Sequence, residues 1–201
     1  MKAKQTKRAL QAEETKNRIF ESAMYLFEEY GISQVSMADI AEQAHCTPGN
    51  IYHYFKNKAE IVYRAICALD EPYTAFYEKL MTDPAYAHMT AMERLCEFCC
   101  EIVLLSSEGS YLQSVYIMSI KNPEFGTLRV GSERALYSVL GKLIDAAKEE
   151  GHLQNMDNDE LRRYCMMISR GLLVEWIISY RDFDILEKSR VLFAASLKGL
   201  G

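Results

Sequence analysis

Residues 35–62, VSMADIAEQAHCTPGNIYHYFKNKAEIV, decide the fold of the first part of this chain. Ser36 stands three residues before Asp39, a spacing typical of a capping box at a helix start. The apolar face that follows consists of Met37, Ile40, Ala41 and Ala44. Thr47 and Pro48 then fit the N-cap and the first residue of another helix. The stretch therefore predicts two short helices joined by a tight turn.

Two helices connected this closely are typical of a helix-turn-helix, whose second helix offers its N-terminal residues to the DNA major groove. Ala41 is small where the two helices must touch. Upstream, apolar residues recur at helical spacing over residues 15–30, and Gly31 suits the left-handed turn after a helix. We therefore predict a three-helix DNA-binding head.

The same stretch resembles the DNA-binding domain of the TetR family of bacterial repressors. The similarity rests on Ala41, the turn, the aromatic cluster at 52–55 and Lys58 at the start of a further helix. It covers residues 10–65 strongly, and the remainder agrees in helical character and length. The resemblance implies contact with DNA, with Tyr54 and Lys58 on phosphates. The full DNA-binding set is Ser36, Thr47, Gly49, Asn50, Tyr52, His53, Tyr54 and Lys58.

Two positions depart from the family pattern. Pro48 stands where members often carry a basic or amide side chain, and Ala38 stands where some members contact guanine. Direct base contacts are therefore expected to be few. Phe55 is expected in the core, and Tyr52 either contacts DNA or belongs to the core as well. His53 either contacts DNA or is an exposed polar residue without a role.

Composition favours an all-α protein, because 201 residues include only four prolines and ten glycines and 49% are hydrophobic. We expect about nine helices in two domains, a head with a basic arm at 1–57 and a helical ligand-binding and dimerisation domain at 58–201. Beyond the head, helices are expected at 58–80, 90–105, 111–120, 127–150, 158–180 and 182–198.

The net charge of −5 is unevenly distributed. Residues 1–60 carry eight basic and eight acidic side chains, so the whole deficit lies in residues 61–201. Lys2, Lys4, Lys7 and Arg8 form an arm without acidic residues, suited to a phosphate backbone or equally to a solvated tail.

Aromatic and sulfur side chains are abundant in the second domain and suit either a pocket for a bulky, largely apolar effector or an ordinary core. The acidic surplus favours a cationic or neutral effector over an anionic one. The candidate ligand-binding residues are Tyr63, Phe76, Tyr77, Met92, Phe98, Cys99, Tyr111, Tyr116, Met118, Tyr137 and Trp176.

The helix expected at 158–180 is apolar on more than one face, so it needs cover on several sides. A second copy of the last two helices would supply that cover and form a twofold four-helix interface, as the resemblance also implies. A homodimer predicts a palindromic operator of double-stranded DNA.

Other function classes find little support in the sequence. There is no apolar stretch of membrane-spanning length and no secretion signal, so we expect a cytoplasmic protein without a membrane partner. Cys96, Cys99 and Cys100 lie close together without a second pair or a histidine cluster, and we expect no metal or cofactor. No catalytic motif occurs, so an enzyme is not expected.

The sequence thus predicts a repressor that a small molecule releases from its operator. The alternative is a helical ligand-binding or scaffold protein with a degenerate DNA-binding head.

Overall fold

The computed structural model describes residues 7–68, 70–108 and 134–200, and its secondary structure in these ranges is entirely helical. The all-helical prediction is thereby confirmed. The described chain forms two compact units, the first ending at Ile66 and the second beginning at Cys67. Within these ranges, no helix has the length and apolar character needed to cross a membrane.

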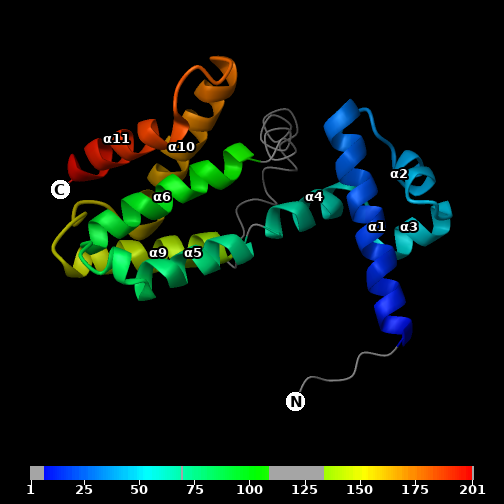
Figure 1. Cartoon of the computed structure of the whole chain (residues 1–201), viewed down its shortest axis with the longest axis horizontal. Helices are drawn as coiled ribbons and strands as arrows, with labels where there is room; N and C mark the ends of the chain where they lie inside the picture. Colours follow the sequence, from blue (N-terminus) through cyan, green and yellow to red (C-terminus); the bar gives the residue numbers. More distant parts are fainter. Residues whose placement is uncertain (1–6, 69, 109–133, 201) are drawn as a thin grey trace. The chain divides into compact units, whose positions relative to one another are not determined.

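The first unit is the head, with helices α1 (Lys7–Tyr30), α2 (Met37–Gln43), α3 (Pro48–Tyr54) and α4 (Lys58–Cys67). Figure 1 shows α2 beside α1 and α3 next to α2. Apolar residues from all four helices and their connections form one core. It comprises Ile19, Ala23, Leu26, Phe27, Ile32, Val35, Ile40, Ala41, Ala44, Ile51, Phe55, Ile61 and Val62.

Helix α1 ends where the sequence predicts but begins earlier. Gly31 has φ +79°, the left-handed conformation expected after the last turn. The helix starts at Lys7, not at 15, so Lys7 and Arg8 of the basic arm are helical. Residues 7–14 contain strong helix formers and neither glycine nor proline, but they lack the apolar periodicity that marks a buried face.

The turn between α2 and α3 closes α2 with a Schellman motif. The N–H of Cys46 donates to Ala41 O at 2.9 Å, and the N–H of His45 donates to Glu42 O at 3.0 Å. His45 takes the left-handed conformation, with φ +49°. Arg18 of α1 donates from Nε to Ala44 O at 3.0 Å, which fastens the end of α2 to α1. The tight turn predicted between the two short helices is thereby confirmed.

The single helix predicted at 58–80 is wrong, because the chain breaks at Ala68 into α4 and α5 (Asp70–Thr82). Pro72 gives the physical reason. In a continuous helix it would lack the N–H for Ala68 O, and its ring would clash with that carbonyl. Within the first turn of α5 the missing donor does no harm. The compact first unit includes α4 as far as Ile66. The division into two functional domains at residue 57 stays a prediction.

The second unit is built around α6 (Ala91–Glu108), which contacts α5, α9 (Ala135–Glu149), α10 (Asn158–Ile178) and α11 (Ile185–Lys198). Figure 1 shows α6 between α10 and α11 on one side and α5 and α9 on the other. A short 3-10 helix, η1 (Pro84–Tyr86), follows α5. The predicted helix at 111–120 and the start of the one at 127–150 lie outside the described residues.

Two helix boundaries predicted in the second unit are confirmed: the start of α10 near residue 158 and the end of α9 near residue 150. The side chain of Asp157 accepts the N–H of Glu160 and so caps α10. Gly151 has φ +91° directly after the end of α9. Asp184 caps α11, which begins at Ile185, later than the predicted 182. A largely buried ion pair of 2.8 Å between Arg134 Nη2 and Asp70 Oδ1 joins the starts of α9 and α5.

Candidate nucleic-acid interface

Helix α3 divides sharply between a buried and an exposed side. Ile51 is fully buried in the core of the head. Thr47, Gly49, Tyr52 and His53 are exposed, and 56% of the Tyr52 surface remains accessible. A large aromatic side chain that its own chain leaves this exposed is available to a partner.

Two hydroxyl groups cap helices at this surface. Ser36 Oγ accepts the N–H of Asp39 at 3.1 Å, and Asp39 Oδ2 accepts the N–H of Ser36 at 2.7 Å, so the predicted capping box is confirmed. These hydrogen bonds hold the pKa of Asp39 below its usual value. Thr47 Oγ1 accepts the N–H of Asn50 at 3.3 Å. Because both hydroxyls act as acceptors here, each keeps its hydrogen for an acceptor such as a phosphate oxygen.

Gly49 has no structural reason to be glycine within its own chain. A Cβ at this position would meet no atom within 4 Å, and the residue does not lie in the left-handed region. Alanine would favour the helix at this exposed site. The missing side chain therefore suits the close approach of another molecule.

The remaining aromatic residues of this stretch are partly structural. Phe55 is 1% exposed, which confirms its predicted place in the core. Tyr54 is half-buried against that core and meets the exposed ring of His53 edge-on, with centroids 5.1 Å apart. Asn50 is half-buried, and no side-chain hydrogen bond is assigned to it in the described structure. Tyr52, His53 and Asn50 thus remain candidates for DNA contact.

Lys58, the first residue of α4, uses its ammonium group inside the head. Its Nζ donates to Ile32 O and to Val35 O, each at 2.7 Å. Both carbonyls belong to the connection between α1 and α2. The predicted phosphate contact by Lys58 is therefore limited to the third N–H of the ammonium group.

Arg64 of α4 is a structural residue that sequence reasoning missed. It donates to Lys16 O at 3.4 Å and to Asn17 Oδ1, and it lies 4.8 Å from the centroid of Phe20. An ion pair of 3.6 Å joins it to Glu13. Together these contacts fasten α4 to α1. The partners lie far upstream in the sequence, so no local pattern could have identified them.

The candidate effector residues occupy several environments. Met92, Phe98 and Cys99 are buried in α6, whereas Phe76, Tyr77, Tyr137 and Trp176 are half-buried and Tyr63 is exposed. Tyr111, Tyr116 and Met118 lie outside the described residues.

Some of these residues pack as ordinary core. The ring of Phe98 stacks on Phe76, with centroids 6.5 Å apart, and meets Tyr73 edge-on at 6.1 Å. Tyr73, which was not among the candidates, is 2% exposed. Trp176 Nε1 donates to Phe183 O at 3.1 Å. The predicted effector pocket stays a prediction.

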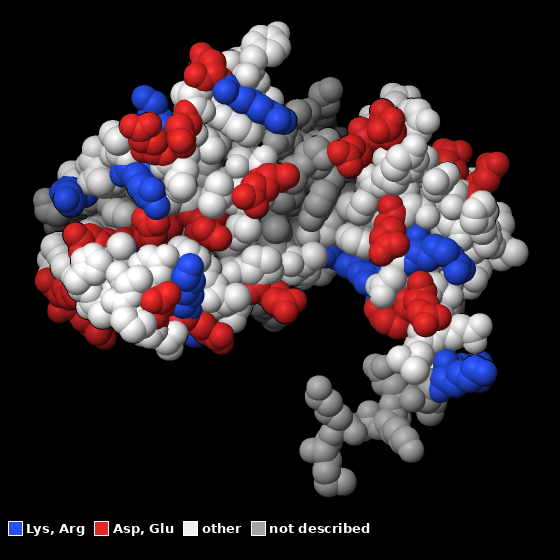
Figure 2. All heavy atoms as spheres, in the orientation of Figure 1, with Lys and Arg blue, Asp and Glu red and all other residues white. Residues whose placement is uncertain are grey.

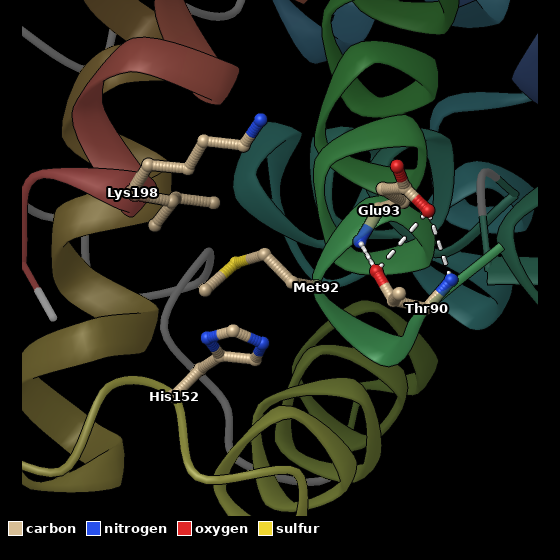
Figure 3. A pocket seen from close by; sticks show the side chains of 6 residues that line it. Thr90, Met92, Glu93, His152 and Lys198 are labelled. Carbon is tan, nitrogen blue, oxygen red and sulfur yellow. Dashed lines mark hydrogen bonds between the residues drawn. The ribbon is translucent and has the colours of Figure 1, made fainter.

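An open cavity of about 470 Å³ lies elsewhere in the second unit. Its lining comprises Thr90, Met92, Glu93, His152, Leu197 and Lys198, so only Met92 belongs to the predicted set. Figure 3 shows that one oxygen of the Glu93 carboxylate is occupied by Thr90, whose N–H donates to it at 2.9 Å. This bond is the main cause of the lowered pKa of Glu93.

The cysteine thiols of α6 are poorly suited to act as nucleophiles or metal ligands, because both roles require the thiolate form. Burial raises the pKa of Cys96 to about 11 and that of Cys100 to about 12, so both are protonated at neutral pH. Burial also raises the pKa of Cys99, whose thiol is hydrogen-bonded to Cys165 of α10. In the described ranges, no group of three or more His, Cys, Asp or Glu side chains could hold a metal ion.

The second unit carries more acidic than basic side chains, as the sequence indicates. On the face shown in Figure 2, acidic side chains spread over the helices of the second unit, in keeping with the acidic surplus of residues 61–201. Helix α3 itself carries neither lysine nor arginine. Its exposed side is therefore polar and aromatic, not cationic.

Comparison with known proteins finds a family whose model is similar to the head. The family model described as "Bacterial regulatory proteins, tetR family" matches residues 19–65. The HTH-type transcriptional regulator TtgR of Pseudomonas putida is 43% identical over 61 residues, which are 30% of this chain and 29% of that protein. The match thus spans less than a third of TtgR.

Longer matches are weaker in sequence. A probable acrEF/envCD operon repressor of Escherichia coli is 23% identical over 208 residues, covering 94% of this chain and 87% of that protein. The crystal structure of the transcriptional regulator FadR from Bacillus subtilis in complex with stearoyl-CoA superposes with a TM-score of 0.68. It is 20% identical and covers 92% of this chain and 99% of that one. This last likeness concerns the fold, a helix-turn-helix head followed by a helical domain.

Proposed function

We propose that this chain, whose residues 19–65 match the family model of tetR bacterial regulatory proteins, is a ligand-responsive transcriptional repressor. In this proposal the head binds a palindromic operator, and a small molecule in the second domain releases it. Repression requires neither catalysis nor a cofactor, and the protein acts in the cytoplasm.

The observation that carries the proposal is the exposed side of α3. Tyr52, His53 and Gly49 face solvent on a helix whose opposite side is locked into the core by Ile51. A rigid helix with an exposed face fits a recognition helix lying in the major groove. Asn50 supplies a side chain that can address an adenine edge through two hydrogen bonds. Ser36, Thr47 and Tyr54 are assigned to the phosphate backbone.

The effector is proposed to be bulky and largely apolar. Stearoyl-CoA, the ligand named for the Bacillus subtilis FadR structure, has a long apolar chain, and a similar helical fold holds it. The second unit of this chain offers half-buried aromatic residues at Phe76, Tyr77, Tyr137 and Trp176. These residues are the described part of the proposed effector site.

The proposed dimer uses a seam of apolar and small residues on α10. Tyr164, Met167, Gly171, Val174 and Ile178 follow one another at intervals of three and four residues, and each is exposed or half-buried. On α11, Val191 is 60% exposed and Leu192 38% exposed. A second copy of the same two helices would cover both faces, and a twofold axis would set the spacing of the two heads.

Gly49→Ala tests the proposed DNA-binding face. The added Cβ meets nothing in the protein, so the free energy of unfolding should stay equal or rise by about 0.5 to 1 kcal/mol. Against DNA the same methyl group should lower affinity at least about tenfold, or about 1.4 kcal/mol. Fluorescence anisotropy with operator DNA selected from a randomised pool measures the affinity, and urea denaturation measures the stability. Equal affinity for wild type and variant would remove Gly49 from the interface.

The alternative is a helical ligand-binding or scaffold protein whose head no longer binds DNA. The absence of lysine and arginine from α3 favours it. Failure of the wild-type protein to retain any sequence from the randomised pool would support this alternative over repression.

A further inference from the structure

We propose that Lys58 serves DNA binding as a positioning residue that fixes the start of α2, and not as a phosphate ligand. The inference rests on the proposed DNA-binding function of the head. It concerns how the first residue of α4 controls the geometry of the helix-turn-helix.

The contacts of the ammonium group carry the inference. Lys58 Nζ lies 2.7 Å from Ile32 O and 2.7 Å from Val35 O, while the side chain of Lys58 is half-buried. Ile32 and Val35 are buried at 4% and 3% exposure. In the described structure no backbone N–H donates to either carbonyl. Buried carbonyls need a donor, and Lys58 supplies it for both.

The position of these carbonyls explains the effect. Val35 directly precedes Ser36, the N-cap of α2. The end of α2 is fastened by Arg18 and leads through the Schellman turn into α3. Lys58 therefore holds one end of α2 and Arg18 the other, so the direction of α3 depends on both bonds.

Two of the three N–H groups of Lys58 already donate to backbone carbonyls of the head. A phosphate would have to share a half-buried ammonium group with two carbonyls at short distance. Loss of Lys58 should thus change the shape of the head more than the number of ionic contacts with DNA.

Lys58→Met separates the two roles, measured in the full-length protein on the selected operator at 10 °C over several salt concentrations. A positioning residue predicts at least about tenfold weaker binding with an unchanged slope of log K against log salt, whereas loss of a phosphate contact lowers the slope by about one. Lys58→Gln, which keeps N–H donors without the charge, should bind more tightly than Lys58→Met, again with the wild-type slope. Lys79→Met, on α5 of the second unit, is the matched loss of one charge and should leave affinity and slope unchanged.

Two results would overturn the inference. One is a slope reduced by about one in both Lys58 variants, which would make Lys58 a phosphate ligand. The other is unchanged affinity with only a lower melting temperature, which would leave Lys58 a purely stabilising role. Amide hydrogen exchange in the DNA-free protein gives an independent readout, because Lys58→Met should accelerate exchange over residues 36–43. Unchanged exchange there would refute the inference even if the wild-type protein bound no DNA.

Discussion

Ile178→Asp combined with Val191→Asp is expected to convert the protein from a dimer to a monomer. Ile178 and Val191 are 64% and 60% exposed, so the substitutions should cost little in the isolated chain. In the proposed four-helix interface they would bury four unpaired carboxylates, whose desolvation exceeds what the remaining contacts can offset. Analytical ultracentrifugation measures the change in mass.

The same double variant should bind a palindromic operator at least about a hundredfold more weakly, because one head makes only half of the contacts. Met81→Asp is the matched control, since Met81 is also exposed, at 47%, but lies on α5. It should remain dimeric and retain wild-type affinity. A double variant that stays dimeric would show that α10 and α11 do not form the interface.

Phe55→Ala is expected to unfold the head while the second unit stays folded. Phe55 is 1% exposed and fills the core between α1, α3 and α4, with Lys16 and Arg64 about 6 Å from its ring centroid. Removal of a buried phenylalanine side chain costs about 3 to 5 kcal/mol, a large fraction of the stability of a small helical unit. Circular dichroism should show partial loss of helix at 25 °C.

Tyr52→Ala is the control for that experiment, because Tyr52 is an aromatic residue of α3, the helix that Phe55 follows as C-cap, and is 56% exposed. Its free energy of unfolding should stay within about 0.5 kcal/mol of the wild-type value. Equal stability of Phe55→Ala and Tyr52→Ala would contradict the assignment of Phe55 to the core.

The head was largely predictable because its signals are local. Ser36 and Asp39 form their capping box, Thr47 and Pro48 begin α3, and Gly31 ends α1 in the left-handed conformation. Each of these features depends on residues within one turn of one another. The family resemblance added the exposed role of α3, which periodicity alone could not give.

The predictions of helix bounds and of contacts failed where the structure depends on exposed residues or on residues far apart in the sequence. Helix α1 extends back to Lys7 without an apolar stripe, and Pro72 divides a periodic stretch that appeared continuous. The bonds from Lys58 to Ile32 and Val35 join residues more than twenty positions apart, so no sequence spacing reveals them. In the second unit, a buried aromatic residue such as Phe98 is expected both in an apolar pocket and in an ordinary core. The sequence alone therefore does not distinguish the two.

The most direct test of the central claim is a titration of labelled DNA from upstream of the protein's own gene, at two salt concentrations, with wild type and Tyr52→Ala. The account predicts nanomolar, salt-sensitive binding by the wild type and a loss of at least about tenfold in the variant, whose stability is unchanged. Wild-type binding to neither this DNA nor a randomised pool would contradict it.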